Sequence, residues 1–218
     1  MQGTPDLKRL VAKTLLVTPS GALSPGPLSA VAVGVGLGLG PLGGFMVALG
    51  HMVAELPYVY GLVRFIDRMI VWVDRWRRPL LLLVSAFLVY FGASLIGESV
   101  EVYRGYTSSV SESILSMYEA LLAGIALTIF NPYFLAWWAT VGYPLVEDSA
   151  RLGSRGFIVM YVSHVWMDYA WLILLAWGGG VARILGAKPY AALLGLLGFV
   201  LLAFAVKLLR DAFQQTSK

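Results

Sequence analysis

The chain has 218 residues, of which 59% are hydrophobic and only 13% are charged, about half the charged fraction of an average soluble domain. A mean hydropathy of +0.78 argues against an ordinary soluble fold and indicates a protein that lies in lipid. The net charge of +4 does not indicate a nucleic-acid-binding protein, because the Lys and Arg residues separate apolar stretches instead of forming one basic patch. The absence of cysteine excludes a disulfide framework and a thiolate metal site, and it argues against a thiol redox relay.

Apolar stretches long enough for membrane-spanning helices recur along the whole chain. A helix needs about 20 such residues to cross about 30 Å of hydrocarbon. On this criterion we predict an all-α integral membrane protein of six transmembrane helices in two halves, residues 1–105 and 106–218. The predicted helices cover about residues 14–39, 42–64, 79–97, 113–146, 156–178 and 189–208.

The distribution of Lys and Arg predicts how these helices are oriented. Basic residues are concentrated in the N-terminal segment, in the second and fourth connections and in the C-terminal segment, and they are sparse in the other connections. The positive-inside rule then places both termini in the cytoplasm. This alternation requires an even number of spans, so it supports a multi-pass protein of the cytoplasmic membrane with six helices.

The second and fifth predicted helices carry the same pattern, a histidine followed four residues later by an acid. His51 precedes Glu55, and His164 precedes Asp168. This spacing places each pair on one helix face, and a rise of about 1.5 Å per residue places both acids near the middle of the membrane. Ionisable groups at that depth are costly and are functional candidates. Each carboxylate can alternate between carrying a proton and binding a substrate ammonium group; a structural ion pair between the halves is the other interpretation.

Three roles stay open for the two histidines. His51 and His164 can relay protons to the neighbouring carboxylates. They can also complete a divalent-metal site of two imidazoles and two carboxylates with Glu55 and Asp168. The third interpretation is an interior imidazole bonded to a backbone carbonyl. We expect no resident cofactor.

The helix before each of these pairs is interrupted by proline. Pro25-Gly26-Pro27 breaks the first predicted helix, and Asn131-Pro132 breaks the fourth. A proline removes a backbone donor, so the freed groups must face protein, water or substrate. Half-helices that begin after such breaks point free N–H groups at an anion such as a carboxylate. Asn131 either satisfies freed backbone groups or binds substrate.

Broken helices at matching positions of two halves are typical of secondary transporters with inverted repeats. Three helices in each half give the halves opposite orientations. The substrate site of such a transporter lies between the halves near the middle of the membrane. We find no nucleotide-binding loop and no nucleophile motif, so we expect a transporter driven by a gradient and not an enzyme.

At these residues the chain resembles the LysE (lysine exporter, RhtB-type) family of amino-acid exporters. The family's Asn-Pro-Lys appears here as Asn131-Pro132-Tyr133, so Tyr133 stands where the family has a lysine. The Pro-Gly-Pro of the first helix is present, as is the glycine-rich entry to the second, here Gly36, Gly38, Gly40, Gly43, Gly44 and Gly50. The missing cation indicates a divergent branch, so lysine itself is not transferred as the substrate.

The resemblance implies export of amino acids or similar small amphoteric metabolites, by proton-coupled antiport with alternating access. A divalent-metal exporter that uses the two His-acid pairs is the alternative, since families related to LysE handle metal ions. The expected partners are a small-molecule substrate and membrane lipid. Gly36, Gly40 and Gly44 recur at four-residue spacing, which is typical of close helix packing and also of a homodimer contact or a hinge.

Overall fold

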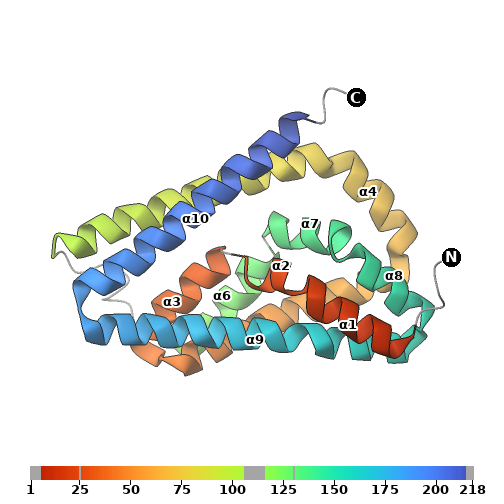
Figure 1. Ribbon diagram of the computed structural model, residues 1–218, viewed down its shortest axis with the longest axis horizontal. Coiled ribbons are helices and arrows are strands. Elements are labelled where there is room, and N and C mark those ends of the chain that lie inside the picture. The colour runs from red at the N-terminus through yellow and green to blue at the C-terminus, as the bar shows by residue number, and fades with distance from the viewer. Residues whose placement is uncertain (1–5, 25, 106–115, 130, 215–218) are drawn as a thin grey trace.

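The structure, a computed structural model, describes residues 6–24, 26–105, 116–129 and 131–214 (Figure 1). Every secondary-structure element in these ranges is an α-helix, which confirms the all-α prediction. The helices are α1 (Leu7–Val17), α2 (Pro19–Ala22), α3 (Pro27–Leu39), α4 (Pro41–Tyr103), α6 (Met117–Ile129), α7 (Pro132–Thr140), α8 (Tyr143–Arg151), α9 (Gly153–Leu185) and α10 (Ala187–Gln214).

Long helices enclose a group of short ones. Figure 1 shows α1 beside α9 along one edge of the molecule and α10 along the C-terminal part of α4 at the other edge. The short helices α2, α3, α6 and α7 lie between these edges. The middle of the molecule is therefore built from helix ends, where backbone amides and carbonyls have no partner within their own helix.

The helix α4 contains both the second and the third predicted spans. It runs for 63 residues, and its only non-helical backbone angles are those of Phe65, at φ −127° and ψ 29°. The basic connection that we predicted at residues 64–78 thus continues as helix after this kink. Pro57 and Pro79 also lie inside α4, where each removes one backbone hydrogen bond.

Both predicted helix breaks are sharp bends. Leu7–Ala22 meets Pro27–Leu39 at 73°, and Met117–Ile129 meets Tyr133–Thr140 at 56°. In both cases a proline begins the following helix, Pro27 in α3 and Pro132 in α7. Proline is tolerated at a first helical position because the N–H that it lacks would have no partner there. Pro25, the first residue of the predicted motif, lies outside the described residues.

The helices that could cross a membrane can be compared with the six predicted spans. Within the described residues, three helices are long and apolar enough to cross a membrane, and the two bent pairs raise this number to as many as five. The three are Pro41–Phe65, Gly153–Ala182 and Ala187–Phe213. Six spans in two inverted halves stay a prediction.

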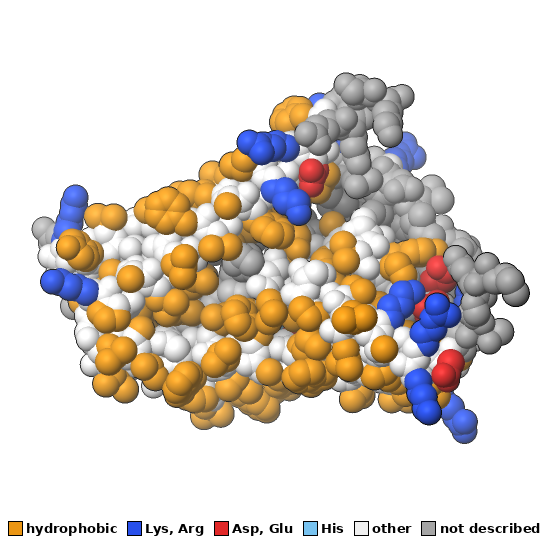
Figure 2. All heavy atoms as spheres, in the orientation of Figure 1, with side chains coloured by type: hydrophobic (Ala, Val, Ile, Leu, Met, Phe, Trp, Pro, Cys, Tyr) orange, Lys and Arg blue, Asp and Glu red, His pale blue; other side chains and the backbone are white. Residues whose placement is uncertain are grey.

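The outside of the molecule is apolar, whereas acids are buried inside it. Leu16 is 81% exposed and Ile184 is 85% exposed, while Glu55 is 1% exposed. Figure 2 shows hydrophobic side chains over the middle of the visible face, with Lys and Arg toward its two ends and near the C-terminal end of α10. A surface of this kind fits a hydrocarbon environment better than water.

Glycines allow α4 and α6 to pack backbone to backbone. A side chain at Gly124 would collide with the carbonyl oxygen of Val47, and one at Gly50 would collide with that of Leu121. Both collisions involve backbone atoms, which cannot move aside as a flexible side chain can. Small residues at helix contacts are the usual means by which membrane helices approach closely.

The glycine repeat of the sequence makes a similar contact with α9. A Cβ atom at Gly36 would meet the carbonyl oxygen of Ala176, and one at Gly44 would meet that of Leu172. Gly40 lies between them at the turn from α3 to α4, with a φ of +56° that favours glycine. Gly36 and Gly44 therefore pack within the chain.

The contact between α4 and α6 is testable with two matched glycine variants. Gly124→Ala should destabilise the protein by about 1–3 kcal/mol, because the added methyl group overpacks the contact with Val47. Gly61→Ala, in α4 with open space around its Cβ position, should be neutral or slightly stabilising, since alanine favours helix. Thermal unfolding in detergent compares the two. Equal melting temperatures would contradict the close contact.

Candidate functional site

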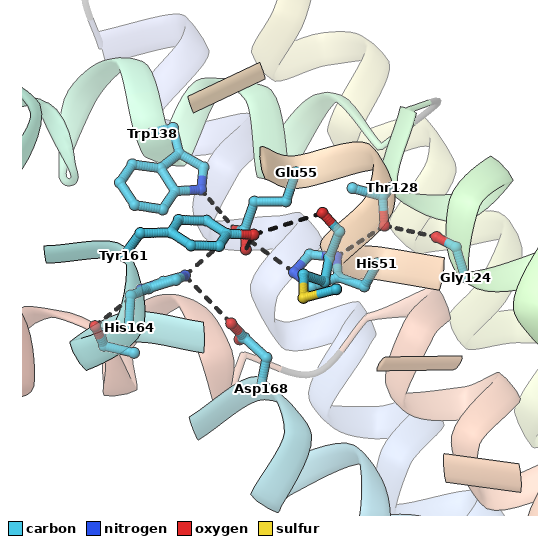
Figure 3. A network of polar contacts seen from close by, with 10 residues as sticks. His51, Glu55, Gly124, Thr128, Trp138, Tyr161, His164 and Asp168 are labelled. Carbon is cyan, nitrogen blue, oxygen red and sulfur yellow. Dashed lines mark hydrogen bonds and ion pairs between the residues drawn. The ribbon is translucent and has the colours of Figure 1, made fainter. Parts of the chain in front are cut away.

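The four predicted site residues of the His-acid pairs meet in the interior. His51 and Glu55 come from α4, His164 and Asp168 come from α9, and none is more than 6% exposed. Glu55 Oε1 lies 3.3 Å from His164 Nε2 and 3.5 Å from His51 Nε2, and His164 Nε2 also lies 3.3 Å from Asp168 Oδ2 (Figure 3). The site therefore joins one helix from each half of the chain.

Glu55 is surrounded by hydrogen-bond donors. The indole Nε1 of Trp138 donates to its Oε1 at 3.0 Å, and the hydroxyl of Tyr161 donates to its Oε2 at 3.2 Å. With the two imidazoles, these groups face the carboxylate from α4, α7 and α9. Such a set of donors offsets the cost of burying a charge. Neither Tyr161 nor Trp138 was among the residues predicted for the site.

Two threonines hold the imidazole rings in place. Thr128 Oγ1 donates to the carbonyl of Gly124 at 2.7 Å and lies 2.8 Å from His51 Nδ1. A hydroxyl has a single proton to donate, so Thr128 accepts from His51, whose Nδ1 therefore carries a hydrogen. The other ring is held similarly, with His164 Nδ1 2.9 Å from Thr18 Oγ1. Among the described residues, both Nδ1 atoms thus contact threonine hydroxyls and not the backbone carbonyl of the third interpretation.

The hydrogen bond from His51 Nδ1 to Thr128 affects how the other ring nitrogen of His51 interacts with Glu55. With a hydrogen on Nδ1, a neutral ring presents only a lone pair at Nε2, which would face a Glu55 oxygen 3.5 Å away. A lone pair beside a carboxylate is repulsive. The contact is favourable only when a further proton lies on His51 Nε2 or on Glu55. A proton beyond those of a neutral imidazole and a carboxylate would therefore be stabilised between His51 and Glu55.

Asp168 differs from Glu55 in its partners. Its Oδ2 is buried, yet among the described residues it has no hydrogen-bond partner. His164 Nε2 is 3.3 Å away, but that nitrogen makes its hydrogen bond with Glu55 Oε1. A buried carboxylate oxygen without a donor is costly unless something else binds it.

A cavity of about 80 Å³ lies against this cluster. Aromatic side chains form much of its wall, including Phe134, Trp137 and Phe204. Ten residues were predicted for the site, and eight of them line the cavity, namely Gly26, Pro27, His51, Glu55, Asn131, Tyr133, His164 and Asp168. Pro25 lies outside the described residues, and Pro132 begins α7 next to Asn131.

The N-termini of the two half-helices, α7 and α3, differ in how they are capped. At α7 the side chain of Asn131 accepts from the amides of Tyr133 and Phe134, at 3.1 and 3.4 Å. Asn131 therefore caps its own helix, a structural role. At α3 the N-cap is Gly26, and no side chain of the described residues forms a capping hydrogen bond. The end of α3 is thus the one that a bound anion can cap.

The same cluster has the donor set of a cation site. Ligand atoms of His51, Glu55 and Asp168 all lie within 4.8 Å of one another, and all three residues are buried. The imidazole Nε2 atoms point inward while Nδ1 bonds to threonine, as the outer nitrogens of metal-binding histidines usually bond to a second group. A divalent cation would be cargo here and not a resident cofactor.

An apolar exterior, broken helices and a buried polar cavity define a membrane transport protein. The LysE type translocator family matches residues 19–212, so the chain belongs to that family. The protein is accordingly a membrane translocator and not an enzyme. No curated protein and no solved structure matches the chain.

The hydrogen bonds to Glu55 are testable with two tyrosines of α9. Tyr161→Phe removes a donor from a buried carboxylate and should destabilise the protein by about 1–3 kcal/mol. Tyr169→Phe removes a hydroxyl that contacts Met52 Sδ at 3.5 Å and should have a much smaller effect. Thermal unfolding in detergent measures both, and an equal loss in the two variants would contradict the assigned role of Tyr161.

Proposed function

We propose that the protein exports amino acids or similar small amphoteric metabolites across the cytoplasmic membrane, as a proton-coupled antiporter that works by alternating access. The observation that carries this proposal is the buried cluster of Glu55, Asp168 and two histidines beside a cavity at the breaks of two helices. The uncapped N-terminus of α3 and an Asp168 oxygen without a hydrogen-bond partner among the described residues suit a molecule with both charges. Membership in the LysE type translocator family supports the transport function.

The proposed architecture has six spans in two inverted halves, with both termini in the cytoplasm. Contacts exchanged between the halves support it. His51 of the first half bonds to Thr128 of the second, and His164 of the second half bonds to Thr18 of the first. Each threonine precedes a helix break of its own half, so the two halves use corresponding residues in the same way.

Tyr133 is the proposed reason that the substrate differs from that of the lysine-bearing relatives. It lines the cavity, and its ring packs at a centroid distance of 5.5 Å against Phe204. A lysine here would supply a fixed positive charge beside the cavity. With tyrosine, the carboxylate of the substrate must find other donors.

Proton coupling is proposed because several hydrogen-bond donors and acceptors lie close together in the site. A proton held between His51 and Glu55 would lie close to a second acid, Asp168, which contacts His164 Nε2 at 3.3 Å. Binding of a substrate ammonium group near these acids makes an extra proton less favourable. Substrate and proton would then occupy the site in turn, as an antiporter requires.

A divalent-cation exporter is the second candidate function. The clustered ligand atoms of His51, Glu55 and Asp168 favour it. The donors Trp138 and Tyr161 argue against it, because N–H and O–H groups directed at Glu55 compete with a cation for the same oxygens. An amino acid also accounts for the aromatic wall of the cavity.

Counterflow in proteoliposomes tests the transport proposal directly. Vesicles loaded in turn with unlabelled amino acids should take up the labelled form of at least one of them. Exchange of manganese or zinc without exchange of any amino acid would favour the second candidate. If protein shown to be folded exchanged neither amino acids nor metal ions, the proposed function would be contradicted.

The two buried acids are the proposed coupling groups. Glu55→Gln and Asp168→Asn should each abolish net transport driven by a pH gradient, by about a hundredfold or more, while the protein stays folded. Glu101→Gln, which changes an exposed acid of α4, should transport normally. Transport at the normal rate in both buried variants would contradict the mechanism.

A further inference from the structure

We propose that the cavity binds a small neutral zwitterion in one orientation, with its ammonium group on Asp168 Oδ2 and its carboxylate on the N-terminus of α3. This inference rests on the proposed amino-acid export and assigns its substrate class. The site would then select small neutral amino acids over lysine, and over derivatives that have lost either charge.

Asp168 is the carboxylate left for the ammonium group. Glu55 already has Trp138 Nε1 on one oxygen and the Tyr161 hydroxyl on the other. Asp168 lines the cavity, and its buried Oδ2 has no hydrogen-bond partner among the described residues. A buried oxygen in this state gains most from a charged donor, and an ammonium group supplies one.

The N-terminus of α3 is the matching anion site. Gly26, Pro27, Leu28 and Ser29 all line the same cavity as Asp168. Pro27 has no N–H, so the first amides of this helix belong to Leu28 and Ser29, within the turn that has no intrahelical acceptor. Within the part of the chain that the structure describes, no side chain caps them. A substrate carboxylate would take the place that Asn131 fills in α7.

The volume and the charges of the cavity limit which side chain the substrate can carry. A cavity of about 80 Å³ is smaller than the cavities of about 150 Å³ that take up benzene in proteins. It therefore suits a molecule of the size of glycine, alanine or serine. Among the described lining residues, the acids are Glu55 and Asp168, so the second ammonium of lysine would have no carboxylate of its own.

Alanine and two of its derivatives test the orientation in the purified full-length protein. Binding can be followed by tryptophan fluorescence, because Trp137 and Trp138 line the cavity. Alanine should bind at least about tenfold more tightly than alaninamide, N-acetylalanine or lysine. Asp168→Asn should lose this binding by about tenfold or more, whereas Asp211→Asn, near the end of α10 and outside the cavity, should keep it.

The helix end is tested by a substitution at Gly26 and a control elsewhere. Among the described residues, a Cβ atom at Gly26 meets nothing within 4 Å, so a side chain fits sterically. Gly26→Asp adds a capping carboxylate that competes with the substrate, and alanine binding should fall by about tenfold or more. Gly61→Ala, which also has open space at its Cβ and lies outside the cavity, should bind alanine like the unchanged protein.

The outcomes separate this inference from the proposed function. If counterflow finds an amino-acid substrate but alaninamide binds as well as alanine, or Gly26→Asp binds normally, the orientation is wrong and the export function stands. If lysine binds better than alanine, the substrate class is wrong. If no amino acid binds or exchanges, the proposed function itself fails.

Discussion

The arrangement of the whole molecule depends on one buried carboxylate, Glu55, which needs hydrogen-bond donors around it. Glu55 is 1% exposed inside a protein whose exterior is apolar, and a charge in such a place is stable only when donors surround it. The donors come from α4, α7 and α9. Glu55 therefore binds the two halves of the chain together, and any motion of one half against the other must change the contacts of this group.

The helix breaks and the glycines make that arrangement sterically feasible. Because α3 and α7 begin in the middle of the molecule, their N-termini lie at the cavity and not at the surface of the protein. Gly50 and Gly124 allow the backbones of α4 and α6 to come into contact. This close packing brings His51 within hydrogen-bond distance of Thr128. The same structural features thus provide the packing, the orientation of the imidazoles and the polar lining.

The sequence predicted the centre of the site better than its surroundings. Glu55 and Asp168 stand out because ionisable residues in apolar helices are rare, and proline marks the breaks. Tyr161 and Thr128 carry no such signal, since hydroxyl and aromatic side chains are ordinary in membrane helices. The difference between Asp168 and Glu55 depends on contacts across helices that spacing cannot reveal. Similarly, a cluster of arginines does not show that α4 continues through residues 64–78.

Charge movement on a solid-supported membrane tests the central claim most directly, because it detects coupled transport without labelled substrate. Proteoliposomes exposed to alanine should produce a transient current, since the proposed antiport exchanges a neutral zwitterion for a proton. Asp168→Asn should produce none. A current evoked by manganese or zinc, together with none from alanine or any other amino acid, would contradict the account and assign the buried cluster to a metal cargo.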